Sequence, residues 1–456
     1  MKPVNKIRDV ATSDDILILD EPTLKDLEVF EAASGENSLF QFCNFAVTEG
    51  GVKVLKHRMA NPWSSASRIR ATQGAIKSIL EHPSLFSNLP TAYTVNRVEH
   101  YSREVLPIVT ADSLIEFSLG AFSLWANHDR HYLGILRGVQ VGCRLISGLR
   151  SFAHEAEQLT LGGELVPLVA AMSALLSDDH LDNVPQNITG ARFWKVLRLD
   201  QAFRIHHKDT IGRLLRIVYE IDALKSLAQA TENHGFVLPE VKEGVLRVEV
   251  EGLVHPFVTN AVPNAVELND ERHILFLTGP NMAGKTTYLR AFATALYLAQ
   301  LGMGVPARRF AFVPTRRLFS SITLSDDLRG GISYFRAEAL RVKAVAEALA
   351  NGDSVVALMD EPFKGTNVKD AYDASLAILN RFSEKKDCLF MFSSHLIELS
   401  ERLTDAKRID CRYFEAQEGE GRLQFDYLLR AGVSNQRLGM RVLEEEGVFE
   451  LLDGSK

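Results

Sequence analysis

The sequence contains little cysteine. Its 456 residues include only four, at Cys43, Cys143, Cys388 and Cys411. These positions are widely separated, and no two have the Cys-x-x-Cys spacing that brings a pair of thiolates onto one metal ion. We therefore expect reduced, packed thiols rather than metal ligands.

The sequence also lacks a long apolar run and an excess of positive charge. No uncharged apolar stretch reaches the roughly 18 residues that span a bilayer. Residues 1–15 carry charges where a signal peptide has its apolar segment. These absences predict a cytoplasmic protein without a membrane partner. The 51 Lys and Arg are outnumbered by 58 Asp and Glu, for a net charge of -7. That balance excludes a uniformly basic nucleic-acid coat but permits a local basic face.

The composition is that of a folded protein, with 46% hydrophobic and 24% charged residues, and the length suggests two to four domains. Up to about residue 235 the pattern is helical: residues 67–80, 133–149 and 211–230 place apolar side chains at intervals of three and four. Residues 177–190 are polar and contain Pro185, so we expect a connector there.

The pattern changes after residue 236. Apolar runs at 274–277, 355–359 and 389–392 each lead into a loop and then a helical pattern. This order predicts a mostly parallel sheet with helices on both faces, preceded by an all-α domain. We expect the boundary between residues 235 and 236, and a return to helix over residues 424–452.

Residues 279–287 read GPNMAGKTT and fit the GxxxxGK[ST] phosphate loop (Walker A) between a strand and a helix. The glycines let backbone N–H groups face the phosphates, and the helix N-terminus favours an anion. Lys285 would contact the β- and γ-phosphates, and the Thr286 hydroxyl would bind Mg²⁺.

Two carboxylates, Asp360 and Glu361, follow the predicted strand 355–359. Parallel sheets bind ligands at the carboxyl ends of their strands, so this pair should face the phosphate loop. Asp360 would hold Mg²⁺ through water, and Glu361 would polarise the attacking water. His395 ends the next predicted strand, where a hydrogen bond could sense the γ-phosphate. Between them, Ser333 follows two glycines at the start of a predicted helix, where it fits an N-cap.

The order of these motifs matches ABC-type ATPases, and the residues resemble the ATPase domain of the MutS DNA mismatch-repair family. The similarity rests on TGPNMAGKTTYLR, SDDLRGGISYFRAEALR, MDEPFKGTN, FSSHLIELSERL and FDYLLRAGVSNQRLGMRVLEEEG. It implies an ATPase that converts ATP and water to ADP and phosphate with Mg²⁺, stimulated by DNA. A helix-turn-helix over about 424–452 would support a homodimer of ATPase domains.

The resemblance also implies roles for individual residues. Ser333 would act in trans on the partner's γ-phosphate, and His395 would be the switch. Tyr427 would stack on adenine, with Val262 covering the other side of the base. The nucleotide cradle would comprise the whole phosphate loop: Gly279, Pro280, Asn281, Met282, Ala283, Gly284, Lys285, Thr286 and Thr287.

The sequence departs from the family in its first half. Core-like sequence begins almost at once, so we expect neither the mismatch-reading domain with its Phe-x-Glu wedge nor full-length levers with a complete clamp. Residues 362–364 replace the family's usual Gly-Arg loop.

Basic and aromatic residues between Arg192 and Lys208 fit either a phosphate-binding surface or a solvated helix face. Two functions therefore stay open: a DNA-metabolism switch in mismatch repair or damage and junction recognition, or an ATP-gated protein-assembly or ribosome-associated module without DNA.

Overall fold

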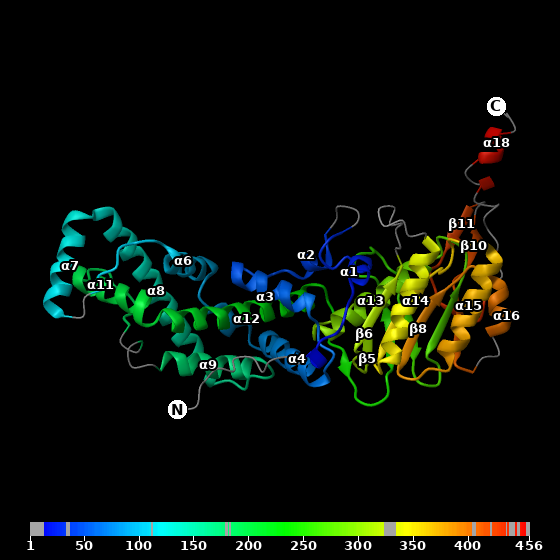
Figure 1. Cartoon of the computed structure of the whole chain (residues 1–456), viewed down its shortest axis with the longest axis horizontal. Coiled ribbons are helices and arrows are strands. Elements are labelled where there is room, and N and C mark those ends of the chain that lie inside the picture. Colours follow the sequence, from blue (N-terminus) through cyan, green and yellow to red (C-terminus); the bar gives the residue numbers. More distant parts are fainter. Residues whose placement is uncertain are drawn as a thin grey trace. The chain divides into compact units, whose positions relative to one another are not determined.

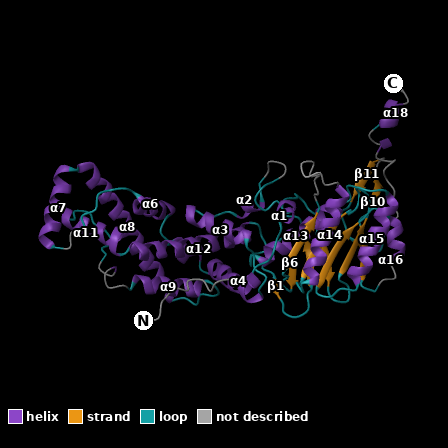
Figure 2. Ribbon diagram, in the orientation of Figure 1, coloured by secondary structure: helices purple, strands orange, loops and turns teal. Residues whose placement is uncertain are grey.

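The computed structural model describes residues 13–32, 37–110, 113–177, 181, 184–322, 334–403, 407–419, 422–434, 436, 443–444 and 447–452. The chain forms two compact units. The first comprises residues 1–10, 43–60 and 71–230, and the second comprises residues 11–42, 61–70 and 231–456. Figure 1 traces the elements along the chain, and Figure 2 shows that strands occur in the second unit while the first is helical. No helix among the described residues is long and apolar enough to cross a membrane.

The first unit is built from helices and one π-helical turn, Ala202–His206. The helices are α3 (Glu49–Ala60), α5 (Pro83–Ser87), α6 (Ala92–Arg103), α7 (Leu114–Asn127), α8 (Asp129–Glu157), α9 (Leu165–Leu176) and α11 (Phe193–Gln201), with parts of α4 (Ala66–Glu81) and α12 (Lys208–Asn233). The predicted helices 67–80, 133–149 and 211–230 correspond to α4, α8 and α12. Two residues of the expected connector, Val184 and Ile188, are buried, and part of it lies outside the described residues.

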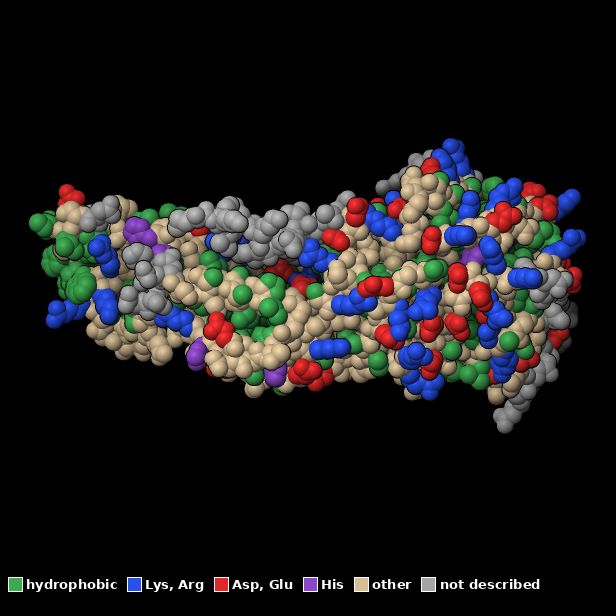
Figure 3. Space-filling view, turned by 90° about the horizontal axis from the view of Figure 1, so that it is seen from below, with side chains coloured by type: hydrophobic (Ala, Val, Ile, Leu, Met, Phe, Trp, Pro, Cys, Tyr) green, Lys and Arg blue, Asp and Glu red, His purple; other side chains and the backbone are tan. Residues whose placement is uncertain are grey.

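The described residues of the second unit form three sheets with helices around them. Its helices are α1 (Glu21–Asp26), α2 (Leu39–Cys43), α13 (Lys285–Gln300), α14 (Tyr334–Ala350), α15 (Val368–Ser383), α16 (Ile397–Leu403) and α18 (Val448–Leu452), with a 3-10 turn at Ser13–Asp15. Its strands are β1 (Glu240–Val241), β2 (Val248–Leu253), β3 (Asn264–Leu268), β4 (Ile274–Thr278), β5 (Arg309–Phe312), β6 (Arg317–Ser321), β7 (Val355–Asp360), β8 (Cys388–Ser393), β9 (Ile409–Tyr413), β10 (Ala416–Gly419), β11 (Arg422–Phe425) and β12 (Arg430–Ala431). On the face of this unit seen in Figure 3, cationic and anionic side chains are interspersed.

The largest sheet has the strand order β12-β9-β4-β8-β7-β6. Its strands are parallel except for β12, which pairs antiparallel with β9. A second sheet has the order β1-β5-β2-β3, and β10 and β11 form a hairpin. The predicted strands 274–277, 355–359 and 389–392 are β4, β7 and β8, so the unit is α/β with a mostly parallel main sheet.

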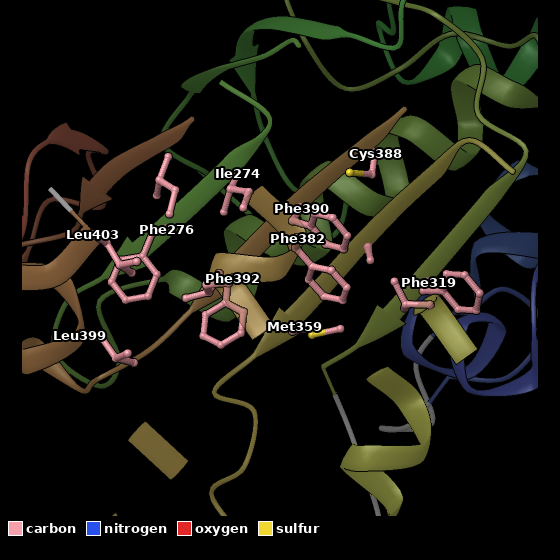
Figure 4. Packing of buried hydrophobic residues seen from close by; sticks show 14 of the residues in the cluster. Ile274, Phe276, Phe319, Met359, Phe382, Cys388, Phe390, Phe392, Leu399 and Leu403 are labelled. Carbon is pink, nitrogen blue, oxygen red and sulfur yellow. The ribbon is translucent and has the colours of Figure 1, made fainter. Parts of the chain in front are cut away.

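Successive side chains of the central strands point to opposite faces of this sheet, and both faces are buried. Side chains of one face, including Phe276, Met359 and Phe390, are buried with α14, α15 and α16 (Figure 4). Phe390 stacks on Phe382 of α15 with ring centroids 4.2 Å apart. The intervening residues of the strands are buried as well, and α13 contacts β7 and β8. Burial on both faces explains why these strands read as continuous apolar runs.

The N-terminal residues of the second unit were expected in the helical domain. Instead, Ile18 bridges Arg317, and α1 contacts β6, which is an edge strand. The Asp26 carboxylate accepts hydrogen bonds from the Ser320 hydroxyl at 2.8 Å and the Ile322 amide at 2.7 Å. These contacts cover the edge strand β6. No local sequence pattern predicts them.

The expectation of helix from residue 424 onward needs correction. Residues 424 and 425 lie in β11, which pairs with β10, and residues 430 and 431 form β12 at the sheet edge. The backbone there is strand because its amides find partners on neighbouring strands. Helix occurs at α18, and most of residues 435–446 lie outside the described residues.

Candidate functional site

The phosphate loop connects β4 to α13, as its sequence predicts. All five residues of β4 are buried, and the chain turns through Gly279 with φ 140° and Gly284 with φ 101°. A Cβ on Gly279 would lie 2.7 Å from the Phe414 carbonyl oxygen, so only glycine fits there. Gly284 is the N-cap residue of α13, whose first amides are therefore directed at the loop. This arrangement can receive an anion.

Lys285 lies inside this loop. Its side chain is only 5% exposed, and its ammonium group donates hydrogen bonds to the carbonyl oxygens of Gly279 at 2.8 Å and Pro280 at 3.1 Å. Burial lowers the pKa of Lys285, while the carboxylates of Glu361 and Asp360 oppose that shift. A buried cation held by weak acceptors gains from an incoming phosphate oxygen, which is a stronger partner.

Asp360 and Thr286 face one another across the site. The Thr286 hydroxyl donates to Asp360 Oδ2 at 2.6 Å, and the Ser393 hydroxyl donates to Asp360 Oδ1. The register of β7 and β8 places Asp360 directly beside Ser393, so the strand ends meet at one edge of the sheet. Hydroxyl and carboxylate oxygens are ligands that Mg²⁺ prefers, so the oxygens of Thr286 and Asp360 fit that ion. The described residues contain no cluster of three or more His, Cys, Asp or Glu that could hold a metal by themselves.

Glu361 lies between Lys285 and His395. Its Oε1 is 3.6 Å from Lys285 Nζ, and its Oε2 is 3.7 Å from His395 Nδ1. Its backbone has φ 48°, a left-handed conformation that is rare for a glutamate. The Glu361 amide donates to the Ser393 hydroxyl at 3.0 Å, which supports this conformation. Such strain is typical of functional positions.

Glu361 and His395 shift each other's pKa. Pairing with His395 lowers the pKa of Glu361, against the effect of burial, and Lys285 lowers it further. The same pairing raises the pKa of His395. Glu361 is therefore held as a carboxylate, and His395 is 58% exposed beside it.

A cavity of about 700 Å³ adjoins the loop, within the range of small-molecule sites. Its lining includes the polar and charged residues Lys285, Thr286, Asp360 and Glu361. It also includes apolar and aromatic residues, among them Val254, Val258, Val262, Phe414 and Tyr427. The cavity thus offers groups suited to an anion together with groups suited to a flat, apolar ring.

The structure brings Val262 and Tyr427 to this cavity, and one residue that sequence reasoning missed connects them. The Asn264 amide group donates to the carbonyl oxygens of Val262 at 3.2 Å and Tyr427 at 2.9 Å. Asn264 Oδ1 also accepts the Leu429 amide at 2.7 Å. Tyr427 itself has φ 55°. The link to the second segment was not predictable from a local pattern, because Tyr427 and Leu429 lie more than 160 residues from Asn264.

Ser393, His255 and Lys364 were also not predicted. Ser393 shares hydrogen bonds with Asp360 and Glu361, and its signals were its place at a strand end and within the segment FSSHLIELSERL. His255 and Lys364 line the cavity. Burial and the charge of Arg290 lower the pKa of His255 to about 4, so it is a neutral imidazole near pH 7. Ser333 lies outside the described residues.

The basic and aromatic cluster of the helical unit divides into two parts. Arg204 is buried and pairs with Asp200, and its remaining donors reach the carbonyl oxygens of Leu106 and Pro107. It is therefore a structural cation and not part of a phosphate-binding surface. Arg192, Lys195 and Arg198 are exposed.

The loop, the buried lysine, the paired carboxylates and the adjoining cavity define the second unit as a P-loop nucleotide-binding domain. A family model for MutS domain V matches residues 275–451. This part of the chain is therefore similar to domain V of the MutS family.

Curated relatives agree with that assignment. The chain is 34% identical over 254 residues to the DNA mismatch repair protein MutS of Bacillus licheniformis, covering 54% of this chain and 28% of that protein. It is 33% identical over 242 residues to DNA mismatch repair protein MutS 2 of Halobacterium salinarum, covering 52% and 27%. It is 30% identical over 282 residues to the MutS of Persephonella marina, covering 60% and 32%. The matched stretch thus spans about a third or less of these relatives.

Proposed function

We propose that this chain binds ATP with Mg²⁺ and hydrolyses it to ADP and phosphate. The observation that carries the proposal is the position of Glu361, within 3.7 Å of both the phosphate-loop lysine and His395, in the lining of the cavity. Similarity to MutS proteins supports ATP as the nucleotide. Adenine would lie against Val262 and Tyr427.

The side chains divide the chemistry among them. Lys285 would exchange its two carbonyl partners for oxygens of the β- and γ-phosphates. Thr286 and Asp360 would hold Mg²⁺, which neutralises charge on the phosphate oxygens when bound. Glu361 would accept a hydrogen bond from the attacking water and orient it. Because its pKa is lowered, Glu361 is a weak base, and positioning of the water is the larger part of its role.

His395 would hold the other oxygen of Glu361 and respond to the γ-phosphate. Ser333 would reach the γ-phosphate of a partner subunit, so that ATP closes a homodimer of ATPase domains and moves the helical levers. This dimer follows from the family resemblance, and the residues that carry it lie largely outside the described part of the chain.

The best-supported biological role is a switch in DNA metabolism, because the relatives are DNA mismatch repair proteins. One observation favours the alternative, an ATP-gated protein-assembly module without DNA. Arg204, which lies within the basic segment, forms a buried ion pair with Asp200 and does not face solvent. ATPase rates with homoduplex, mismatched and branched DNA, at low and moderate salt, separate the two. Stimulation that falls with salt supports the switch, and no stimulation by any DNA supports the alternative.

Substitution Glu361→Gln tests the ATPase itself. The amide keeps the size of the side chain but removes the charge that orients water, so turnover should fall about 10²- to 10⁴-fold. ATP binding, followed with a fluorescent analogue, should persist. Glu384→Gln, at an exposed carboxylate that ends α15, is the matched control and should leave turnover unchanged. Unaltered hydrolysis in the Glu361 variant would refute the assignment.

A further inference from the structure

Helix α7 is apolar around most of its circumference. Its 14 residues, LIEFSLGAFSLWAN, include one charged side chain, Glu116. Phe117, Ala121 and Leu124 are buried, and their spacing of four and three places them on one face. That face packs within the helical unit, where α7 contacts α8 and α11. A helix that is apolar on its outer face as well is normally covered.

The outer face of α7 is exposed. Leu114 is 74% exposed, Ile115 75%, Leu119 67%, Phe122 54% and Trp125 42%. Figure 3 shows apolar side chains gathered at the end of the helical unit that α7 forms, with cationic side chains beside them. Single exposed apolar residues are ordinary, but a contiguous patch of this kind marks an interaction site.

The neighbouring helix α11 extends this patch. The rings of Trp125 and Phe193 stack at 5.0 Å, and Phe122 lies 6.4 Å from Phe193. Trp194, next along α11, is 47% exposed. We call the exposed side chains of Leu114, Ile115, Leu119, Phe122, Trp125 and Trp194 the α7 patch.

Cationic residues adjoin the α7 patch. Arg192 precedes the stacked Phe193, Lys195 follows Trp194, and Arg130 follows the end of α7 by three residues; all three are exposed. Arg198 lies over the Phe117 ring at 4.9 Å. Among the described residues, the acidic side chains of α7 and of the start of α8 are Glu116 and Asp129, so the described cations outnumber them.

We propose that the α7 patch docks onto an anionic lipid surface, with α7 lying in the plane of the membrane. Leu, Ile and Phe side chains would enter the acyl boundary, and the two tryptophans suit the headgroup level. The cations would meet lipid phosphates, each strengthening attachment to anionic membranes. The expectation of no membrane partner rested on the absence of a spanning segment, which peripheral attachment does not need.

Charge and polarity favour this occupant over two others. DNA presents phosphates that bind cations, but it takes up single apolar side chains as wedges between bases, whereas Ile115 and Leu119 belong to a continuous apolar face. A second copy related by a two-fold axis would bring the same cationic border onto itself. An anionic bilayer satisfies both the apolar face and the cations.

The test uses the full-length chain and its co-sedimentation with vesicles. Vesicles of equimolar phosphatidylglycerol and phosphatidylcholine should bind it, and phosphatidylcholine alone should bind it less. Ile115→Glu and Leu119→Glu should each weaken binding about tenfold or more. Val105→Glu is the matched control, because Val105 is a fully exposed apolar residue outside α7. Circular dichroism and thermal unfolding of each variant verify that the helical unit is folded.

Two further measurements are independent of the apolar substitutions. Two of the three tryptophans lie in the α7 patch, so their fluorescence should shift to shorter wavelength on anionic vesicles. Arg192→Glu with Lys195→Glu should abolish the preference for anionic lipid. The proposal is overturned if the vesicles do not bind, or if binding survives both apolar variants. It is also overturned if those variants instead dissociate a dimer in light scattering, or abolish DNA binding while vesicle binding persists.

Discussion

The two units contain networks of charged side chains that differ in how tightly they are paired. In the helical unit, Arg204 donates to both oxygens of Asp200, at 2.6 and 2.5 Å, and the Tyr101 hydroxyl donates to the same carboxylate. In the nucleotide-binding unit, Glu361 lies 3.6 Å from Lys285 and 3.7 Å from His395. Close, buried pairing uses up the hydrogen-bonding capacity of a charge, whereas loose pairing beside a cavity leaves it for a ligand.

We therefore expect the first network to stabilise the fold and the second to take part in the proposed chemistry. The side chains of Asp200 and Arg204 are 1% and 5% exposed, while that of His395 is 58% exposed. Breaking the first should therefore reduce stability, and breaking the second should reduce activity.

The largest expected effect belongs to Asp200→Ala. Removing this carboxylate leaves the Arg204 guanidinium buried without its counter-charge, which should destabilise the helical unit by about 3–5 kcal/mol. The free energy of unfolding in urea measures it. Asp209→Ala, at an exposed acidic residue near the start of α12, should change stability by less than about 1 kcal/mol. Equal losses in the free energy of unfolding in the two variants would contradict a structural role for the Asp200–Arg204 pair.

Lys285→Met should show the opposite behaviour. Loss of a charged hydrogen-bond donor should weaken ATP binding roughly 10- to 150-fold. Stability should not fall, because burial lowers the pKa of Lys285 and charging it opposes folding at neutral pH. Calorimetric titration with ATP and thermal unfolding measure the two quantities. A large loss of stability would show that Lys285, like Arg204, stabilises the fold, and it would contradict the distinction between the two networks.

A smaller effect is expected at Asn264. Substitution to Ala removes the hydrogen bonds that join Val262 to Tyr427 and should weaken ATP binding about threefold to tenfold. The control is Asn269→Ala, because Asn269 holds a comparable turn through the amides of Glu271 and Arg272, and it lies outside the cavity lining. Equal affinities of the two variants for ATP would contradict the role given to Asn264.

The smallest expected effect is a change in the pKa of His395. The His395 pKa is raised by Glu361, so the imidazolium form adds stability below the ordinary pKa of 6.5 that is lost as the pH rises through the raised value. Glu361, whose pKa is lowered, adds stability above 4.5 that is lost on acidification. Imidazole NMR should give His395 a pKa above 6.5 that returns toward 6.5 in Glu361→Gln. An unchanged value in that variant would mean that the two side chains do not interact.

Much of the nucleotide-binding unit was predictable because its signals are local. The strands β4, β7 and β8 are buried on both faces and read as apolar runs. Each ends in a polar group, and the phosphate loop needs its glycines within one turn. The positions of Lys285, Thr286, Asp360 and Glu361 at one sheet edge follow from parallel pairing. The chemical roles given to these residues stay predictions.

Other features were not predictable from local patterns. The packing of α1 on the edge strand β6 joins residues about 300 positions apart, and Asn264 joins segments about 160 apart. The strands at 422–425 and 430–431 were read as helix because their pairing partners, β10 and β9, are not part of the local pattern.

The sequence alone therefore determined the kind of site that this protein carries, because loop chemistry and strand-end carboxylates depend on neighbouring residues. Only the tertiary structure decided which charges are free to act. It buried Arg204 against Asp200, held Glu361 in a left-handed conformation between Lys285 and His395, and left the outer face of α7 exposed. Burial and pairing arise from contacts between distant segments, and those contacts decide whether a charged or apolar side chain supports the fold or meets a ligand.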